Sequence, residues 1–386
     1  MTTAPVAPLT QLGRLSVADF MRTTWQKRPR LLRNALPLAS PPVDADALFT
    51  LAARDDVESR LVTSFDGRWS LRDGPLPARA LPARRRADWT LLVQGVDLYL
   101  PAAAALRERF RFISDARLDD VMVSYASDGG GVGPHVDSYD VFLLQARGTR
   151  RWRVSRQRDL DLVPGLPLKI LADFRAEHDW LLEPGDLLYL PPGVAHEGTA
   201  VGPDCITCSI GFRAPAYREL VDPWLDALAE SAHGRAALQA QLRERIDAPT
   251  AHPARLSEAL IDDAFSRLRR IEPTRVQAEQ ALLAVLSEPK PVVAFDPPVR
   301  PLAAAAFARA AARRGLQLDL RTRLLVGGGG RIGINGEVLA LAATERAPIA
   351  RLADCRALPA AQCRALDPLL LTRLHGWYVD GWLHPG

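Results

Sequence analysis

Residues 133–142 read GPHVDSYDVF, and the interpretation of the whole chain depends on this stretch. It follows a run of glycines and places His135 two residues before Asp137, in a chain with only seven histidines. On a β-strand, side chains at positions i and i+2 lie on one face, so the imidazole and the carboxylate can bind one metal ion. A His-x-Asp pair is common by itself. It predicts a metal site only together with a third ligand elsewhere in the chain.

His196 is the candidate third ligand. It lies in GDLLYLPPGVAHEG (185–198), where an apolar strand ends in a Pro-Pro-Gly turn, so His196 is expected at the start of the next strand. Two histidines and one carboxylate on a β-barrel form the facial triad of non-haem Fe(II) oxygenases, which leaves coordination positions open. Asp140 is the alternative carboxylate. It stands three residues after Asp137, hence on the opposite face of a strand, and is expected to hold a loop or contact substrate.

The pattern of apolar residues and turns changes along the chain and divides it into three regions. Up to about residue 215, short β-type segments such as WTLLVQGV, DDVMVSYA, DVFLLQA, RRWRVS and CITCSIGF are broken by Gly/Pro turns, which predicts a sandwich or barrel. Residues 216–290 carry apolar side chains at helical spacing. Residues 291–386 combine a helix with a hairpin around glycines, a pattern found in winged helices. We therefore predict three domains: 1–215, 216–290 and 291–386.

Composition is ordinary for a globular protein, with 48% hydrophobic and 24% charged residues. Apolar runs are too short to span a membrane, and the N-terminus lacks the pattern of a signal peptide, so we expect a cytoplasmic protein. Cys205 and Cys208 lie three apart in a strand-like run, where they would face opposite sides, so buried thiols are expected rather than a zinc site. The net charge is +4, and we expect no direct nucleic-acid binding.

GGGVGPHVDSYDVFLLQARGTRRWRV together with EPGDLLYLPPGVAHEG resembles the JmjC-type 2-oxoglutarate oxygenases, which have a double-stranded β-helix (cupin) fold. More narrowly, these segments and FMRTTWQKRPRLLRNAL resemble the bacterial ribosomal oxygenases that hydroxylate C3 of an arginine in a large-subunit ribosomal protein. The order of JmjC domain, helical dimerisation segment and winged helix is similar as well. The resemblance implies a homodimer and a ribosomal-protein substrate.

The resemblance also implies a site. Fe(II) would be held by His135, Asp137 and His196, with 2-oxoglutarate and O2 as co-substrates. Arg150 occupies the motif position that anchors the distal carboxylate of 2-oxoglutarate, and an arginine fork suits a carboxylate. On a strand, Arg150 and Arg151 face opposite sides, so Arg151 stays open as the alternative anchor. Hydroxyl bonds to the same carboxylate are expected from Ser124 and Thr207.

Two alternatives share part of this pattern. A JmjC histidine hydroxylase or lysyl demethylase would use the same metal chemistry on another substrate. A non-catalytic cupin regulator would use the winged helix to bind DNA. No dense basic recognition helix is evident in the C-terminal region, although RAAARRG (309–315) carries some charge.

Overall fold

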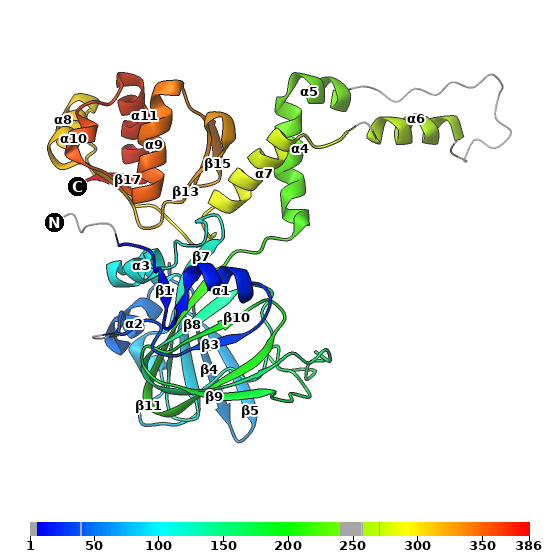
Figure 1. Ribbon diagram of the computed structural model, residues 1–386, viewed down its shortest axis with the longest axis vertical. Coiled ribbons are helices and arrows are strands. Elements are labelled where there is room, and N and C mark those ends of the chain that lie inside the picture. The colour runs from blue at the N-terminus through cyan, green and yellow to red at the C-terminus, as the bar shows by residue number, and fades with distance from the viewer. Residues whose placement is uncertain (1–5, 39–40, 240–255, 257, 270) are drawn as a thin grey trace. The chain divides into compact units, whose positions relative to one another are not determined.

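A computed structural model describes residues 6–38, 41–239, 256, 258–269 and 271–386 (Figure 1). The chain forms two compact units, each assembled from separate stretches of sequence. The first unit contains Met1–Ala214, Lys290–Thr322 and Asp354–Gly386, and the second contains Pro215–Pro289 and Arg323–Ala353. The three linear domains stay a prediction, because the C-terminal segment contributes to both units. Residues 240–255 of the predicted helical segment lie outside the described residues.

The first unit is built on a nine-stranded sheet in the order β3-β10-β8-β11-β7-β6-β4-β5, with β9 also paired to β8. All of these pairings are antiparallel. The strands are β3 (Arg30–Leu32), β4 (Ser59–Phe65), β5 (Arg68–Asp73), β6 (Trp89–Val93), β7 (Leu118–Ala126), β8 (Val141–Ser155), β9 (His178–Leu182), β10 (Leu187–Leu190) and β11 (Ala195–Phe212). The predicted β-type segments are confirmed as strands, with DVFLLQA and RRWRVS joined in the single strand β8. The mainly antiparallel β architecture expected from the sequence is therefore confirmed.

The two faces of this sheet have different roles. One face packs in the main apolar core with helices α1 (Val17–Thr23), α2 (Ala45–Ala52) and α3 (Pro101–Glu108), which lie against the sheet in Figure 1. Strand β7 directs Val123 and Tyr125 into this core. Strand alternation therefore turns Ser124 to the other face, where a smaller apolar cluster surrounds Trp152 and Leu188. The functional side chains predicted from the sequence gather on this second face.

A register shift in β8 decides which residues face which side. Gln145 pairs with Thr207 of β11 and Arg147 pairs with Ile206, so β8 advances two residues where β11 advances one. Such a bulge reverses the inward and outward alternation beyond it. Gly148 follows immediately with a positive φ of 64°, and a Cβ there would lie 3.1 Å from the Asp204 carbonyl oxygen. Glycine is therefore the residue that lets β8 continue after the bulge.

Shorter elements complete the first unit. They are β1 (Gln11–Leu12), β2 (Leu15–Ser16), η1 (Ala78–Ala80), η2 (Val96–Leu98), α8 (Ala304–Arg314), β12 (Leu316–Leu318), β16 (Ala357–Leu358), α10 (Ala360–Cys363), α11 (Pro368–Val379) and β17 (Leu383–Pro385). At the start of α1, the Ser16 Oγ accepts a hydrogen bond of 3.0 Å from the Asp19 amide, so Ser16 caps the N-terminus of this helix.

The second unit is helical, with a small sheet. It contains η3 (Tyr217–Leu220), α4 (Val221–Glu230), α5 (Ala232–Gln239), α6 (Glu258–Leu268), α7 (Arg275–Ser287), β13 (Leu324–Val326), η4 (Gly328–Gly330), β14 (Arg331–Ile334), β15 (Glu337–Ala340) and α9 (Ala343–Cys355). The predicted hairpin around glycines is β13–β14, and a third strand, β15, pairs with β14 beyond a turn at Asn335 and Gly336. The helical segment and the strands of the winged helix are thus present as expected.

Two simple expectations are also tested by the structure. Cys205 and Cys208 are buried, unpaired and in different apolar clusters, as the three-residue spacing on a strand predicts. Within the described residues, no helix is both long enough and apolar enough to cross a membrane.

Candidate functional site

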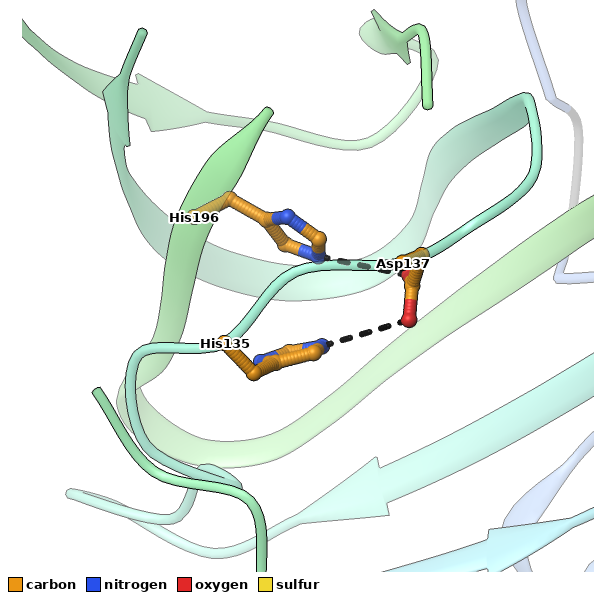
Figure 2. A group of neighbouring side chains, drawn as sticks. All are labelled: His135, Asp137 and His196. Carbon is orange, nitrogen blue, oxygen red and sulfur yellow. Dashed lines mark ion pairs between the residues drawn. The ribbon is translucent and has the colours of Figure 1, made fainter. Parts of the chain in front are cut away.

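The predicted ligands come together at one end of the barrel. His135, Asp137 and His196 offer ligand atoms that all lie within 4.8 Å of one another. The Nε2 atoms of His135 and His196 lie 4.0 and 3.6 Å from the carboxylate oxygens of Asp137, and Figure 2 shows both rings turned toward that carboxylate. This arrangement suits a divalent cation held on one side by two nitrogens and one oxygen.

The segment carrying His135 and Asp137 is a loop and not the strand assumed from the sequence. Only His135 forms a β-bridge, in which the backbones of His135 and His196 exchange two hydrogen bonds of 2.9 Å. The Asp137 carbonyl accepts a further bond of 2.8 Å from the Gly193 amide in the Pro-Pro-Gly turn. His196 stands at the start of β11, as predicted. Backbone bonds to β11 and its preceding turn therefore bring the ligands together.

The glycines before His135 pack tightly against β11. A Cβ on Gly131 would lie 2.6 Å from the Gly198 carbonyl oxygen of β11, so only glycine fits there. Gly129 donates to Ala200 and Ala200 donates to Gly130, which ties the loop to the same strand. The loop thus approaches β11 along its backbone before it reaches His135.

The hydrogen bonds of the two histidines prepare them as ligands. Each Nδ1 lies 2.9 Å from a carbonyl oxygen, of Gly133 for His135 and of Val194 for His196. A carbonyl only accepts, so each Nδ1 carries the proton and each Nε2 keeps a free lone pair. Burial, helped by the neighbouring His135, lowers the pKa of His196 to about 3. The imidazole is therefore neutral, which is the form that binds metals.

Burial has the opposite effect on the carboxylate. It raises the pKa of Asp137, although His135 and Arg60 oppose the shift. A buried carboxylate with a raised pKa gains most from a cation held against it. The donor set thus fits a divalent metal.

Asp140 does not join this group and instead anchors the loop. It is fully buried, and its carboxylate accepts bonds from the Tyr189 hydroxyl at 2.6 Å, Gln26 Nε2 at 2.9 Å and Arg117 Nη2 at 3.3 Å. Three donors on one buried carboxylate fix the backbone three residues beyond Asp137. The alternative role for Asp140 as a metal ligand is not supported by this geometry.

Arg150 lies on the same face of the sheet and is buried. It is 5% exposed, and its Nη1 donates to the Ser124 hydroxyl at 3.3 Å. Its Nε and Nη2 are buried without a hydrogen-bond partner among the described residues. Buried donors of a guanidinium are costly to leave unmatched, so this position calls for an anion. Arg151 points to the opposite, exposed face and pairs with Asp179 at 2.5 Å.

The indole of Trp152 lies close to both Arg150 and His196. The Trp152 ring centroid lies 5.6 Å from the Arg150 guanidinium carbon and 5.9 Å from the His196 ring centroid. A Cβ on Gly198 would lie 2.7 Å from this indole, so the glycine leaves the space that Trp152 fills. The indole thus packs between the candidate metal group and the buried guanidinium.

The two predicted hydroxyls differ in their partners. Ser124 and Thr207 pair across β7 and β11, and Thr207 lies on the same long strand as His196. The Ser124 hydroxyl contacts Arg150, whereas the Thr207 hydroxyl donates to Gln145 Oε1 at 2.9 Å. Gln145 is a candidate site residue that the sequence interpretation missed. Its signal was a single amide in the otherwise apolar run VFLLQA (141–146).

Asp120 is a second residue that was missed. It lies on β7 four residues before Ser124, hence on the same face, and it is buried. Its Oδ2 accepts bonds of 2.8 Å from both Lys290 Nζ and the Gly95 amide, while Oδ1 has no hydrogen-bond partner among the described residues. Burial raises the pKa of Asp120 to about 6, against the influence of Lys290. An acidic group thus lies on the site face with one oxygen open.

Comparison with known proteins agrees with the fold. Residues 105–220 match the family model of the JmjC domain, and residues 259–384 match that of the ROXA-like winged helix. The chain is 42% identical over 213 residues to the ribosomal protein uL16 3-hydroxylase of Escherichia coli. That alignment covers 55% of this chain and 56% of the relative, so the match spans about half the length of the curated protein.

Solved structures extend the match to nearly the whole chain. The X-ray structure of E. coli YcfD is 31% identical, covers 97% of this chain and 100% of its own, and has a TM-score of 0.83. A structure described as the ribosomal oxygenase YcfD in complex with cobalt and 2-oxoglutarate is 32% identical over 97% of this chain, with a TM-score of 0.82.

The antiparallel sheet and the His-x-Asp…His group define a JmjC-type protein with a candidate metal centre. Together with the winged helix and the near-complete structural match, they place it more narrowly. The chain belongs to the bacterial JmjC ribosomal oxygenase family.

Proposed function

We propose that the chain is a cytoplasmic Fe(II)- and 2-oxoglutarate-dependent oxygenase that hydroxylates C3 of an arginine in a large-subunit ribosomal protein. The observation that carries this proposal is the pairing of two unmatched groups on one face of the sheet. These are the three-ligand group at the barrel end and the buried Arg150 with two free donors. A dicarboxylate that chelates a metal at one end and meets a guanidinium at the other would satisfy both.

Different residues of the chain would then bind the metal, orient the co-substrate and exclude water. His135, Asp137 and His196 would hold Fe(II) from one side, and Arg150 with Ser124 would orient the distal carboxylate of 2-oxoglutarate. When bound, Fe(II) with 2-oxoglutarate and O2 supplies the oxidant for C–H hydroxylation, with succinate and CO2 as coproducts. Trp152 would fill the space between the two ends and keep water out.

Asp120 supports an arginine as the residue to be modified. Its open Oδ1 can accept a guanidinium N–H, and its Oδ2 already binds the cationic Lys290 side chain, so this position accommodates a cation. A neutral histidine side chain would gain much less from this carboxylate. The acid therefore favours an arginine substrate over the histidine alternative.

The direct test uses the purified full-length protein with Fe(II), 2-oxoglutarate, O2 and recombinant ribosomal protein uL16. We expect one added oxygen on a single arginine in tandem mass spectra, with succinate formed in equal amount. Fragment ions should place the oxygen on C3. Oxidation of a histidine, loss of a methyl group from lysine, or no turnover with any ribosomal protein would contradict the proposal.

One relative favours the alternative substrate. A stretch of 76 residues is 43% identical to the bifunctional lysine-specific demethylase and histidyl-hydroxylase NO66 of Dictyostelium discoideum, covering 18% of this chain. Asp120→Asn separates the two substrates. If arginine is the substrate, this change raises the KM for the ribosomal protein by about tenfold, as expected for one charge-assisted hydrogen bond, and leaves the KM for 2-oxoglutarate unchanged.

A homodimer belongs to the same proposal. Helix α6 has no buried residue, and its side chains Ile261, Phe265 and Leu268 are 44%, 58% and 66% exposed. An apolar helix face of this kind is a candidate for contact with a second copy. Light scattering of the purified chain is expected to give the mass of a dimer, and Phe265→Glu is expected to reduce it to that of a monomer.

A further inference from the structure

A cluster of arginines lies on the part of the first unit formed by α8, α10 and α11. These three helices contain no acidic residue within their bounds; the nearest acids, Asp367 and Asp380, flank α11 as its caps. Arg309, Arg313 and Arg314 are exposed on α8, and Arg364 is exposed directly after α10. We call these four residues the arginine surface.

Tertiary packing, and not the sequence, brings the fourth arginine to the other three. Helices α8 and α10 pack against each other and lie side by side in Figure 1. Arg364 Nη1 donates to the Ala312 carbonyl at 3.0 Å, which holds it at the C-terminal turn of α8 beside Arg313. Arg309 and Arg313 are one helical turn apart, so their side chains leave the helix about 6 Å from each other.

The arginine surface also lacks the acidic partners that several other exposed arginines of the unit have. Arg22, Arg54, Arg156 and Arg175 each pair with a carboxylate within 3.3 Å. None of the four residues of the arginine surface has an ion-pair partner among the described residues. Their charges are therefore not neutralised within the unit, and an external anion can meet them without displacing an internal one.

We propose that the arginine surface binds the phosphate backbone of RNA. The choice of RNA rests on the proposed function, in which the substrate is a ribosomal protein. A basic ribosomal-protein segment would be repelled by four arginines, whereas ribosomal RNA is the anionic component that accompanies it. Arginine forks pair bidentately with phosphate and do so without reading base sequence. The surface would hold the enzyme on an RNA-bound form of its substrate. This differs from the expectation that direct nucleic-acid binding is absent.

The test compares two variants with equal changes in charge. One replaces Arg309, Arg313, Arg314 and Arg364 with Gln, and the control replaces the acid-paired Arg22, Arg54, Arg156 and Arg175 with Gln. Each full-length protein is titrated against a fluorescein-labelled single-stranded RNA of about 20 nucleotides, long enough to present several phosphates. Anisotropy is recorded between about 50 and 200 mM salt. Circular dichroism and thermal unfolding check that both variants fold.

We expect the arginine-surface variant to bind at least about tenfold more weakly than wild type. Its slope of log affinity against log salt should fall by about 2 to 3, because each lost phosphate contact on a single strand contributes about 0.7. The control should lose less than about threefold, since its charges are already neutralised by their acidic partners. Equal losses in both variants would mean that only net charge matters and would overturn the proposal.

Two further measurements test whether the partner is RNA and whether the proposed function holds. If wild type does not bind this RNA but binds polyglutamate or anionic phospholipid vesicles, the partner is not RNA. Failure of the RNA proposal is distinguished from failure of the proposed function by turnover of free ribosomal protein. The arginine surface lies on other elements than the candidate site, so the variant should hydroxylate free protein at the wild-type rate.

Discussion

The metal end and the anchor end of the candidate site are built by different means. At the metal end, His135 and Asp137 come from a loop, and backbone bonds from His196 and Gly193 hold that loop in place. At the anchor end, Arg150 and Ser124 lie within long paired strands and meet through their side chains. Geometry at the metal end therefore depends mainly on main-chain contacts, which substitution of a ligand side chain leaves intact. Geometry at the anchor end depends on strand register.

This difference predicts how each end responds to substitution. Ligand loss at the metal end should remove metal binding without unfolding the barrel. Changes at the anchor end should affect the co-substrate and spare the metal. The following experiments measure the affinity for Co(II), the KM for 2-oxoglutarate, or both, so that the independence of the two ends can be contradicted.

The largest effect is expected for His196→Ala. One of three ligands is lost while the backbone bridge to His135 remains, so divalent binding should weaken by more than the roughly 10–100-fold typical of residues that only support a ligand. Turnover should fall below detection. Calorimetric titration with Co(II) measures the affinity. His178→Ala, an exposed histidine on β9, is the control and should bind metal as wild type does. Retained metal affinity in His196→Ala would mean that the ligand set is wrong.

The second-largest effect is expected on the KM for 2-oxoglutarate when Arg150, and not its neighbour Arg151, is replaced. Arg150→Ala should raise the KM for 2-oxoglutarate by about 10–100-fold, the value of one or two charge-assisted hydrogen bonds, with Co(II) affinity unchanged. Arg151→Ala, which removes an exposed pair with Asp179, should change that KM by less than about twofold. Steady-state kinetics with varied 2-oxoglutarate measures both. The reverse result would place Arg151 in the pocket and show that the bulge in β8 is not present.

A smaller effect is expected at the loop anchor. Asp140→Asn replaces one acceptor oxygen by a donor, so it cannot accept from Tyr189 and Gln26 together, and stability should fall by about 1–3 kcal/mol. Because the loop carrying Asp137 loosens, Co(II) affinity should fall by about tenfold. Tyr189→Phe removes one of these bonds and should give a weaker form of both effects. Thermal unfolding and calorimetry measure them. A loss of stability with unchanged metal affinity would mean that Asp140 supports the fold alone.

The smallest effects are expected for the hydroxyls. Ser124→Ala should raise the KM for 2-oxoglutarate by about fivefold, close to one hydrogen bond of about 1 kcal/mol. Thr207→Val should raise it less, because the Thr207 hydroxyl donates to Gln145, and should instead lower stability by about 1 kcal/mol. If Thr207→Val has the larger effect on KM, its hydroxyl turns to the co-substrate when the pocket is filled.

Much of the site could be predicted from local sequence. The Pro-Pro-Gly turn before His196 predicts where β11 begins, and the alternation around Arg150 places it opposite Arg151. The role of Gln145 could not be derived, because an amide in an apolar strand becomes informative only when the strand that faces it is known. The involvement of Asp120 was hidden for a similar reason, since its partner Lys290 lies 170 residues away in the chain.

The sequence by itself determined the residue types and their spacing: two histidines and an aspartate suited to a metal, an arginine suited to a carboxylate, and the strands and helices that carry them. Tertiary structure alone decided which face each strand presents. Gln145 faces the pocket, so strict alternation along β8 would have turned Arg151 toward the pocket as well. The bulge at Arg147 with Gly148 reverses the alternation and places Arg150 there instead. Tertiary packing also decided that the Arg364 side chain lies beside the C-terminal turn of α8. Local propensity sets what each segment becomes, whereas register and packing depend on contacts between residues far apart in the chain.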